Sequence, residues 1–66
     1  MQTTIIRLPE VKKCTGLSRS TIYDLIGKGQ FPRQVVLGAR AVGWVEEDIA
    51  NWIVHRINRS RFSKNS

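Results

Sequence analysis

The first regular pattern of apolar positions along the chain is short and helical. Val11 and Cys14 are three residues apart in the segment 9–15, so a helix there would have one apolar face. Pro9 suits the first turn of a helix, because the N–H that proline lacks would have no intrahelical partner there. Gly16 follows and can adopt the left-handed conformation with which helices commonly end. The pattern predicts a short helix over residues 9–15, with Cys14 as a small buried side chain.

A second apolar stripe begins directly after this turn. Ile22, Leu25 and Ile26 have the i, i+3, i+4 spacing of one buried helix face. Ser18 is a suitable N-cap, because its hydroxyl oxygen can accept a hydrogen bond from a backbone N–H two or three residues further on. Gly29 is expected to end this helix. The sequence therefore predicts two helices joined by a tight turn.

The spacing of apolar residues changes from helical to alternating after Pro32. The segment QVVLGARAVGW contains two short β-prone runs around a turn with glycine, which predicts a β-hairpin. Side chains alternate between the two faces of a strand, so Val35 and Leu37 are expected to share one face of the first strand. Val42 and Trp44 share a face of the second strand. This side of the hairpin is predicted to pack on the helices.

The last helical pattern runs from about Val45 to Arg59. One stripe of this segment is apolar, its first turn is acidic and its last turn is basic, which matches the helix dipole at both ends. The stripe consists of Val45, Ile49, Trp52, Ile53 and Ile57, the acidic turn of Glu46, Glu47 and Asp48, and the basic turn of Arg56 and Arg59. Trp44 and Trp52 are expected to be core residues, because so small a domain needs their bulk.

In order, these elements are a helix, a tight turn, a helix, a hairpin and a helix, which predicts a mainly α fold with a small β-hairpin. A chain of 66 residues is long enough for one domain only. Such a domain buries only about 60% of the surface that its unfolded chain exposes. We assign the domain to residues 1–59 and expect residues 60–66 to form a polar, flexible tail.

The charge of the chain limits the partners that its surface can attract. Lysine and arginine number 11, aspartate and glutamate 5, and the formal net charge is +6. This excess favours phosphate groups or an anionic membrane surface. Strictly apolar stretches are only about two or three residues long, which argues against a membrane segment. The first ten residues, MQTTIIRLPE, lack the pattern of a secretory signal, so we expect a cytoplasmic protein.

Catalytic and metal-binding patterns are absent from the sequence. One cysteine and one histidine can form neither an internal disulfide nor an ordinary zinc site. His55 is expected on the surface of the last helix. The three consecutive acidic residues of that helix diverge around its axis, so dipole matching explains them better than a carboxylate site. We therefore predict that the protein is not an enzyme and needs no cofactor.

The outward face of the second predicted helix carries the main functional signal. Its outward and flanking residues are Arg19, Ser20, Thr21, Tyr23, Asp24 and Gly27. Hydroxyl groups and an arginine at a helix N-terminus suit nucleic acid, because the unpaired N–H groups there bind phosphate and arginine can reach a guanine edge. Asp24 repels phosphate and is expected to face a cytosine amino group or to point away from the DNA backbone. A helical hairpin for packing or protein contact is the alternative.

Four motifs, TGLSRSTIY, FPRQVVLG, AVGW and EEDIANWI, occur along the chain in this order and spacing. With them, residues 7–53 resemble the AlpA family of phage-type DNA-binding regulators, relatives of small excisionases. The resemblance implies a MerR-like winged helix-turn-helix. Residues 18–28 would form the recognition helix in the major groove, and residues 35–44 the hairpin wing beside it.

The resemblance implies double-stranded DNA as the partner and transcriptional regulation of a prophage or integrated genetic element as the function. The expected DNA-binding residues are Ser18, Arg19, Ser20, Thr21, Tyr23, Lys28, Arg33 and Arg40. One alternative is an excisionase that bends attachment-site DNA, with an integrase as a partner. Another is a small protein-interaction adaptor. Because one such domain reads few base pairs, we expect dimers or repeated copies on DNA.

Some of these residues have a purely structural alternative. Tyr23 can pack its ring against the wing and expose only its hydroxyl group. Arg40 has small neighbours in the hairpin turn, so its guanidinium can reach a phosphate or a narrow minor groove, or can remain solvated. Arg33 has the same two alternatives, and Lys28 is either solvated or close to the DNA backbone.

Overall fold

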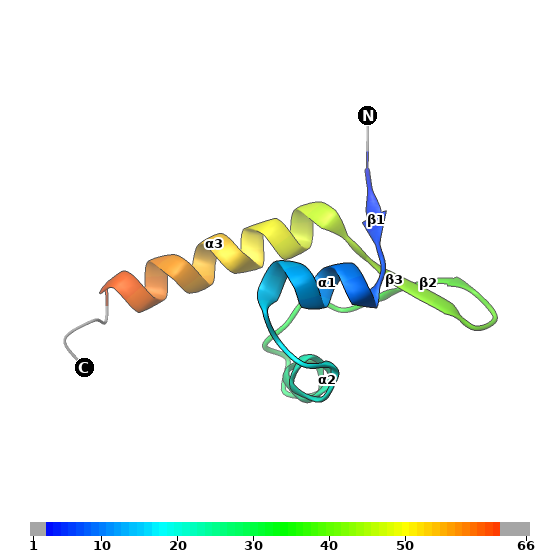
Figure 1. Cartoon of the computed structure of the whole chain (residues 1–66), viewed down its shortest axis with the longest axis horizontal. Coiled ribbons are helices and arrows are strands. Elements are labelled where there is room, and N and C mark those ends of the chain that lie inside the picture. Colours follow the sequence, from blue (N-terminus) through cyan, green and yellow to red (C-terminus); the bar gives the residue numbers. More distant parts are fainter. Residues whose placement is uncertain (1–2, 63–66) are drawn as a thin grey trace.

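The computed structural model describes residues 3–62 of the chain, with side chains for residues 3–61. In this part of the chain the elements are β1 (Ile5–Ile6), α1 (Leu8–Thr15), α2 (Arg19–Gly27), β2 (Val35–Gly38), β3 (Ala41–Val45) and α3 (Glu46–Phe62). The β2–β3 hairpin, which we call the wing, projects to one side of the molecule and α3 to the other, with α2 below α1 (Figure 1). The predicted order of helices and hairpin is confirmed, with one further strand in front.

Local chemistry accounts for the turn between α1 and α2. Gly16 caps α1 in the left-handed conformation, with φ 74°, and its N–H donates to the carbonyl oxygen of Lys12. The Thr15 hydroxyl donates to the Val11 carbonyl oxygen at 2.8 Å and accepts from the N–H of Leu17 at 3.2 Å. The two helices, their tight turn and the adjoining wing together form a small winged helix-turn-helix domain.

The sheet is antiparallel, with β3 in the centre. Its strand order is β1-β3-β2, and Ile5 and Ile6 of β1 pair with Val45 and Trp44 of β3. A Cβ atom at Gly43 would collide with Cγ2 of Ile5 and would lie 3.0 Å from the carbonyl oxygen of Ile6. Glycine at this position therefore permits the close approach of β1, a strand that the apolar pattern did not predict.

The core is a single cluster to which every element except β2 contributes. Its buried side chains in the described part of the chain are Ile6, Val11, Ile22, Phe31, Trp44 and Ile49. Trp52 and Ile53 of α3 are half-buried and pack against this cluster, as Leu17, Leu25 and Ile26 do from the turn and α2. Trp44 is the core residue that the pattern predicted, whereas Trp52 lies at the edge of the core.

The structure corrects the prediction that Cys14 is buried. Val11 is fully buried, but Cys14 is exposed and lines two solvent-open hollows between α1 and α3. The spacing along α1 correctly placed both residues on the side that faces the core. It did not show that α3 leaves room around the last turn of this short helix.

The structure also corrects the predicted packing of the hairpin. Val35 and Leu37 were expected to face the helices, but they are 38% and 46% exposed, and Val36 is 73% exposed. The wing extends beyond the helices (Figure 1), so nothing in the described chain covers the outer part of β2. A register shift between Val36 and Gly38 also interrupts the alternation on which the prediction was based.

The last helix is longer than predicted. It starts at Glu46, because Val45 still pairs within the sheet, and it continues to Phe62. Ile57 was predicted in its apolar stripe but is 43% exposed, since α3 runs past the core. Residues 63–66 of the predicted flexible tail lie outside the described residues, and the division of the chain at residue 59 stays a prediction.

Residues 3–62 contain neither a membrane-spanning helix nor a cluster of metal-binding side chains. Each helix there is too short or too polar to cross a bilayer. In the same range, histidine, cysteine, aspartate and glutamate side chains form no group of three or more that could hold a metal ion.

Candidate nucleic-acid interface

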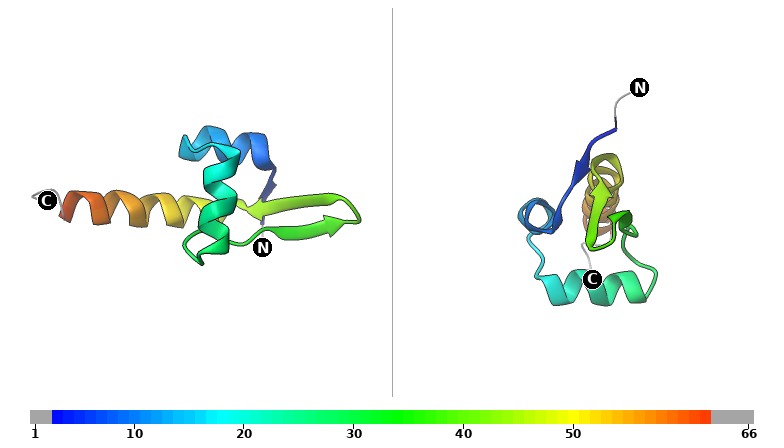
Figure 2. Two further views of the ribbon diagram at one scale, coloured as in Figure 1. Left: turned by 90° about the horizontal axis from the view of Figure 1, so that it is seen from below. Right: turned by 90° about the vertical axis from the view of Figure 1, so that its right-hand side faces the viewer.

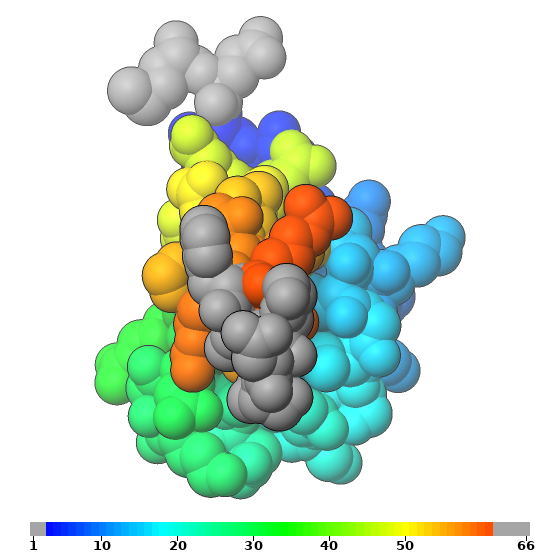
Figure 3. Space-filling model, turned by 90° about the vertical axis from the view of Figure 1, so that its left-hand side faces the viewer, coloured from blue at the N-terminus to red at the C-terminus, as the bar shows by residue number. Residues whose placement is uncertain are grey.

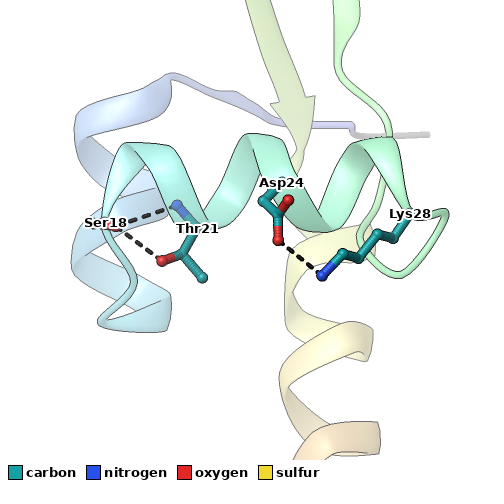
Figure 4. Close-up of polar contacts among 4 residues, drawn as sticks. All are labelled: Ser18, Thr21, Asp24 and Lys28. Atoms are coloured by element: carbon teal, nitrogen blue, oxygen red, sulfur yellow. Dashed lines mark hydrogen bonds and ion pairs between the residues drawn. The ribbon is translucent and has the colours of Figure 1, made fainter.

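The N-terminus of α2 is capped by Ser18, as predicted. Its hydroxyl oxygen accepts from the backbone N–H of Thr21 at 3.2 Å and lies 3.0 Å from the Thr21 hydroxyl oxygen (Figure 4). Ser18 and Thr21 are both exposed, as are Arg19 and Ser20 between them. Four of the eight predicted site residues therefore share one exposed helix turn. Its hydroxyl groups, unpaired N–H groups and cation can bind an anion.

Replacing Ser18 by alanine is expected to lower the free energy of unfolding by about 1 kcal/mol, because the N–H of Thr21 loses its capping partner. Urea unfolding followed by circular dichroism measures this change. The matched control is Ser20→Ala, which alters an exposed hydroxyl in the same turn and is expected to be neutral or slightly stabilising. Equal destabilisation by both substitutions would contradict the capping role of Ser18.

Arg19 lies at the exposed end of a row of ring contacts that begins in the core. Its guanidinium carbon is 5.3 Å from the centroid of the Tyr23 ring. The Tyr23 ring in turn makes an edge contact with the buried Trp44, with centroids 6.3 Å apart and planes at 66°. Stacking on a ring that is itself packed restricts the orientations of the guanidinium. The row therefore holds a cation in place at the first turn of α2.

The same contacts correct the predicted direction of Tyr23. The helical spacing placed this residue on the outward face, but its ring is half-buried against Trp44 on β3 of the wing. The ring thus packs against the wing, which is the structural alternative for Tyr23. The contact between its hydroxyl group and DNA stays a prediction.

The acidic residue of α2 is paired within its own helix. A carboxylate oxygen of Asp24 lies 3.1 Å from Nζ of Lys28 (Figure 4), and the side chains are 63% and 60% exposed. An exposed i, i+4 pair of this kind stabilises a helix by only about 0.3–0.5 kcal/mol. Its main effect is electrostatic, because the lysine offsets a negative charge that would repel phosphate. Lys28 caps the C-terminal end of α2, whereas Arg19 is at its N-terminal end.

The structure places the two predicted arginines of the wing far apart along it. Arg40 is exposed in the two-residue turn between β2 and β3, at the tip of the wing. Arg33 is exposed in the loop between α2 and β2, near the base. Figure 2 shows α2 crossing between the wing and α3. The structure therefore brings Ser18, Arg19, Ser20 and Thr21 together in one turn. It places Lys28 at the other end of α2, and Arg33 and Arg40 at the base and the tip of the wing.

The loop between α2 and the wing is anchored by the two tryptophans. The indole N–H of Trp44 donates to the carbonyl oxygen of Pro32 at 3.1 Å, and that of Trp52 donates to the carbonyl oxygen of Gln30 at 2.9 Å. Phe31, which lies between Gln30 and Pro32 in the chain, is buried. Its ring makes an edge contact with the Trp52 ring, with the ring centroids 4.8 Å apart. These contacts fix the position of the wing relative to α2. The sequence pattern showed that both tryptophans are needed for bulk, but not which carbonyl groups they bind.

Comparison with known proteins identifies the family. Residues 4–57 match the family described as Prophage CP4-57 regulatory protein (AlpA). Uncharacterized protein ORF88 of Enterobacteria phage P4 is 50% identical over 56 residues, which cover 85% of this chain and 64% of that protein. This chain thus spans less than two thirds of the phage protein's length.

A second relative agrees with the first finding. The DNA-binding transcriptional activator AlpA of Escherichia coli (strain K12) is 40% identical over 58 residues, which cover 79% of this chain and 83% of that protein. The family match includes β1, both helices of the helix-turn-helix, the wing and most of α3. The resemblance seen in the sequence is confirmed, and the chain belongs to the family of the Prophage CP4-57 regulatory protein (AlpA).

Proposed function

We propose that this protein is a sequence-specific regulator of transcription that binds double-stranded DNA and serves a prophage or an integrated genetic element. The observation that carries the proposal is the exposed first turn of α2, where Arg19 is held over Tyr23 beside the Ser18 cap. Membership of the AlpA family and 40% identity to a protein named a DNA-binding transcriptional activator support it.

In this proposal α2 enters the major groove with its N-terminal turn. Arg19 reads a base edge, which an arginine can do with two parallel hydrogen bonds to guanine. Ser18, Ser20 and Thr21 bind phosphate through hydroxyl and backbone N–H groups. Arg40 reaches the adjacent backbone or minor groove from the tip of the wing. The remaining contacts come from Lys28, Arg33 and the hydroxyl group of Tyr23.

The domain of residues 1–59 would work in the cytoplasm by binding alone, without catalysis or a cofactor. We expect dimers or repeated copies on one DNA site, because α2 is only nine residues long and its exposed face can read few base pairs. No observation on the described residues favours the excisionase role with an integrase partner, or the adaptor role.

Salt dependence of binding tests the proposal. If the protein neutralises about five phosphates, the logarithm of the association constant K should fall with log salt at a slope of about −4.5. The association constant should then fall about 500-fold between about 50 and 200 mM salt. Fluorescence anisotropy measures the slope, with a labelled duplex taken from the promoter next to the gene of this protein. A duplex of scrambled sequence is the control for sequence specificity. Absence of a complex in dilute buffer, or an affinity that salt does not change, would refute DNA binding.

A further inference from the structure

A hollow beside the recognition helix carries arginines that the sequence analysis assigned only to the helix dipole. It lies between the loop 29–32, which directly follows α2, and one face of α3 with Trp52, His55, Arg56 and Arg59. Among residues 3–61, those that line it include no aspartate or glutamate. The hollow is therefore a place where an anion can approach the guanidinium of Arg56.

Arg56 is held in this hollow by a chain of contacts. Its guanidinium carbon lies 4.8 Å from the centroid of the Trp52 ring, one helical turn away on the same face of α3. Trp52 is itself fixed by its hydrogen bond to Gln30 and its edge contact with the buried Phe31. An arginine stacked on a fixed ring still presents N–H donors at the edge of its planar group, in a fork that fits phosphate.

The hollow lies on the side of α2 that is opposite to the wing. In Figure 2, the wing and α3 extend in opposite directions from α2. Figure 3 shows orange residues of α3 directly above the green segment that follows α2, on the same side of the molecule. A major groove that accepts a helix is about 12 Å wide and has a phosphate backbone on each side. A duplex that receives α2 and touches the wing on one side then brings its other backbone toward the hollow.

From these observations we infer that Arg56 binds a backbone phosphate of the DNA, on the side of the recognition helix away from the wing. This inference rests on the proposed function and adds a contact to it. The wing and α3 then hold the duplex from two sides. Because phosphate contacts carry no base information, Arg56 contributes to affinity for every sequence alike.

The variant Arg56→Gln tests this inference, with anisotropy measured at several salt concentrations. The slope of log K against log salt should become less steep by about 0.9, the value for one lost phosphate contact. Affinity at 100 mM salt should fall about tenfold, and equally on the promoter duplex and on the scrambled one. Arg56→Lys keeps the charge without the planar fork, so it should retain the wild-type slope with an intermediate affinity.

Arg7→Gln is the matched control. It also removes one charge from an exposed arginine, but at the start of α1, outside both the hollow and α2. Its slope should equal that of the wild type. Circular dichroism and urea unfolding of all variants check that each one is folded.

Three results would overturn the inference. An unchanged affinity of Arg56→Gln would exclude a contact, and a lower affinity at an unchanged slope would show that Arg56 only packs on Trp52. Equal slope changes in Arg56→Gln and Arg7→Gln would show a general effect of net charge. Failure of the proposed function is distinguishable from all three, because the wild-type protein would then bind neither duplex.

Discussion

Replacing Trp44 by alanine is expected to remove a large share of the protein's stability. Trp44 is fully buried at the centre of the sheet, contacts the Tyr23 ring and donates a hydrogen bond to Pro32. Removing such a side chain from a core costs about 3–5 kcal/mol. A chain of 66 residues has a total stability of only about 3–10 kcal/mol. The single substitution therefore removes a large share of the stability, and all of it where the total is no larger than this loss of about 3–5 kcal/mol.

Urea unfolding followed by far-ultraviolet circular dichroism measures this loss. Trp44→Phe is the control, because phenylalanine keeps an aromatic ring against Tyr23 but cannot donate to the Pro32 carbonyl oxygen. Its destabilisation should lie between those of the wild type and Trp44→Ala. A Trp44→Ala protein that unfolds at the wild-type urea concentration would contradict the central position of this residue in the core.

Replacing Arg19 by alanine is expected to weaken binding to the target DNA by about 1–3 kcal/mol, which is about 5- to 150-fold. The physical reason is that the guanidinium, held over Tyr23 at the first turn of α2, loses a two-hydrogen-bond contact with a base. Arg19 is exposed, so the fold should remain intact. Anisotropy titrations with the promoter duplex and the scrambled duplex measure the loss, which should be larger on the promoter.

Two variants serve as controls for Arg19. Lys12→Ala removes an exposed cation from α1 and should have a much smaller effect on the promoter duplex. Tyr23→Phe keeps the ring beneath the guanidinium and removes only the hydroxyl group, so it tests the predicted contact of that group separately. Equal losses on both duplexes in Arg19→Ala would make this residue a phosphate contact and not a base reader.

Features that depend on a few neighbouring residues were predictable from the sequence. The Ser18 cap and the left-handed turn at Gly16 follow from the chemistry of the residues themselves, and both are present. The stripe on α2 placed Ile22 correctly in the core. Strand β1 was not predictable in this way, because two isoleucines are too short a run to show a period. They become a strand only by pairing with Val45 and Trp44, which are about 40 residues further along the chain, on the central strand β3.

The errors in the predicted packing have a common origin. Helical spacing tells how residues of one helix are oriented relative to each other, but not where the next element lies. Tyr23 was placed outward and instead packs on Trp44 of the wing. Cys14 was placed in the core and instead borders open space beside α3. The contact between the Arg56 guanidinium and the Trp52 ring was not predictable either, because the sequence does not show how the two side chains pack.

The two indole hydrogen bonds to the loop 29–32 have a consequence for DNA. They join the base of the wing to α2 and α3, so the separation between the two reading elements is set before any duplex arrives. A protein with a fixed separation cannot adjust to variations in groove width. Adaptation then falls to the double helix, and sequences whose base steps bend or twist easily will be preferred even at positions that no side chain touches.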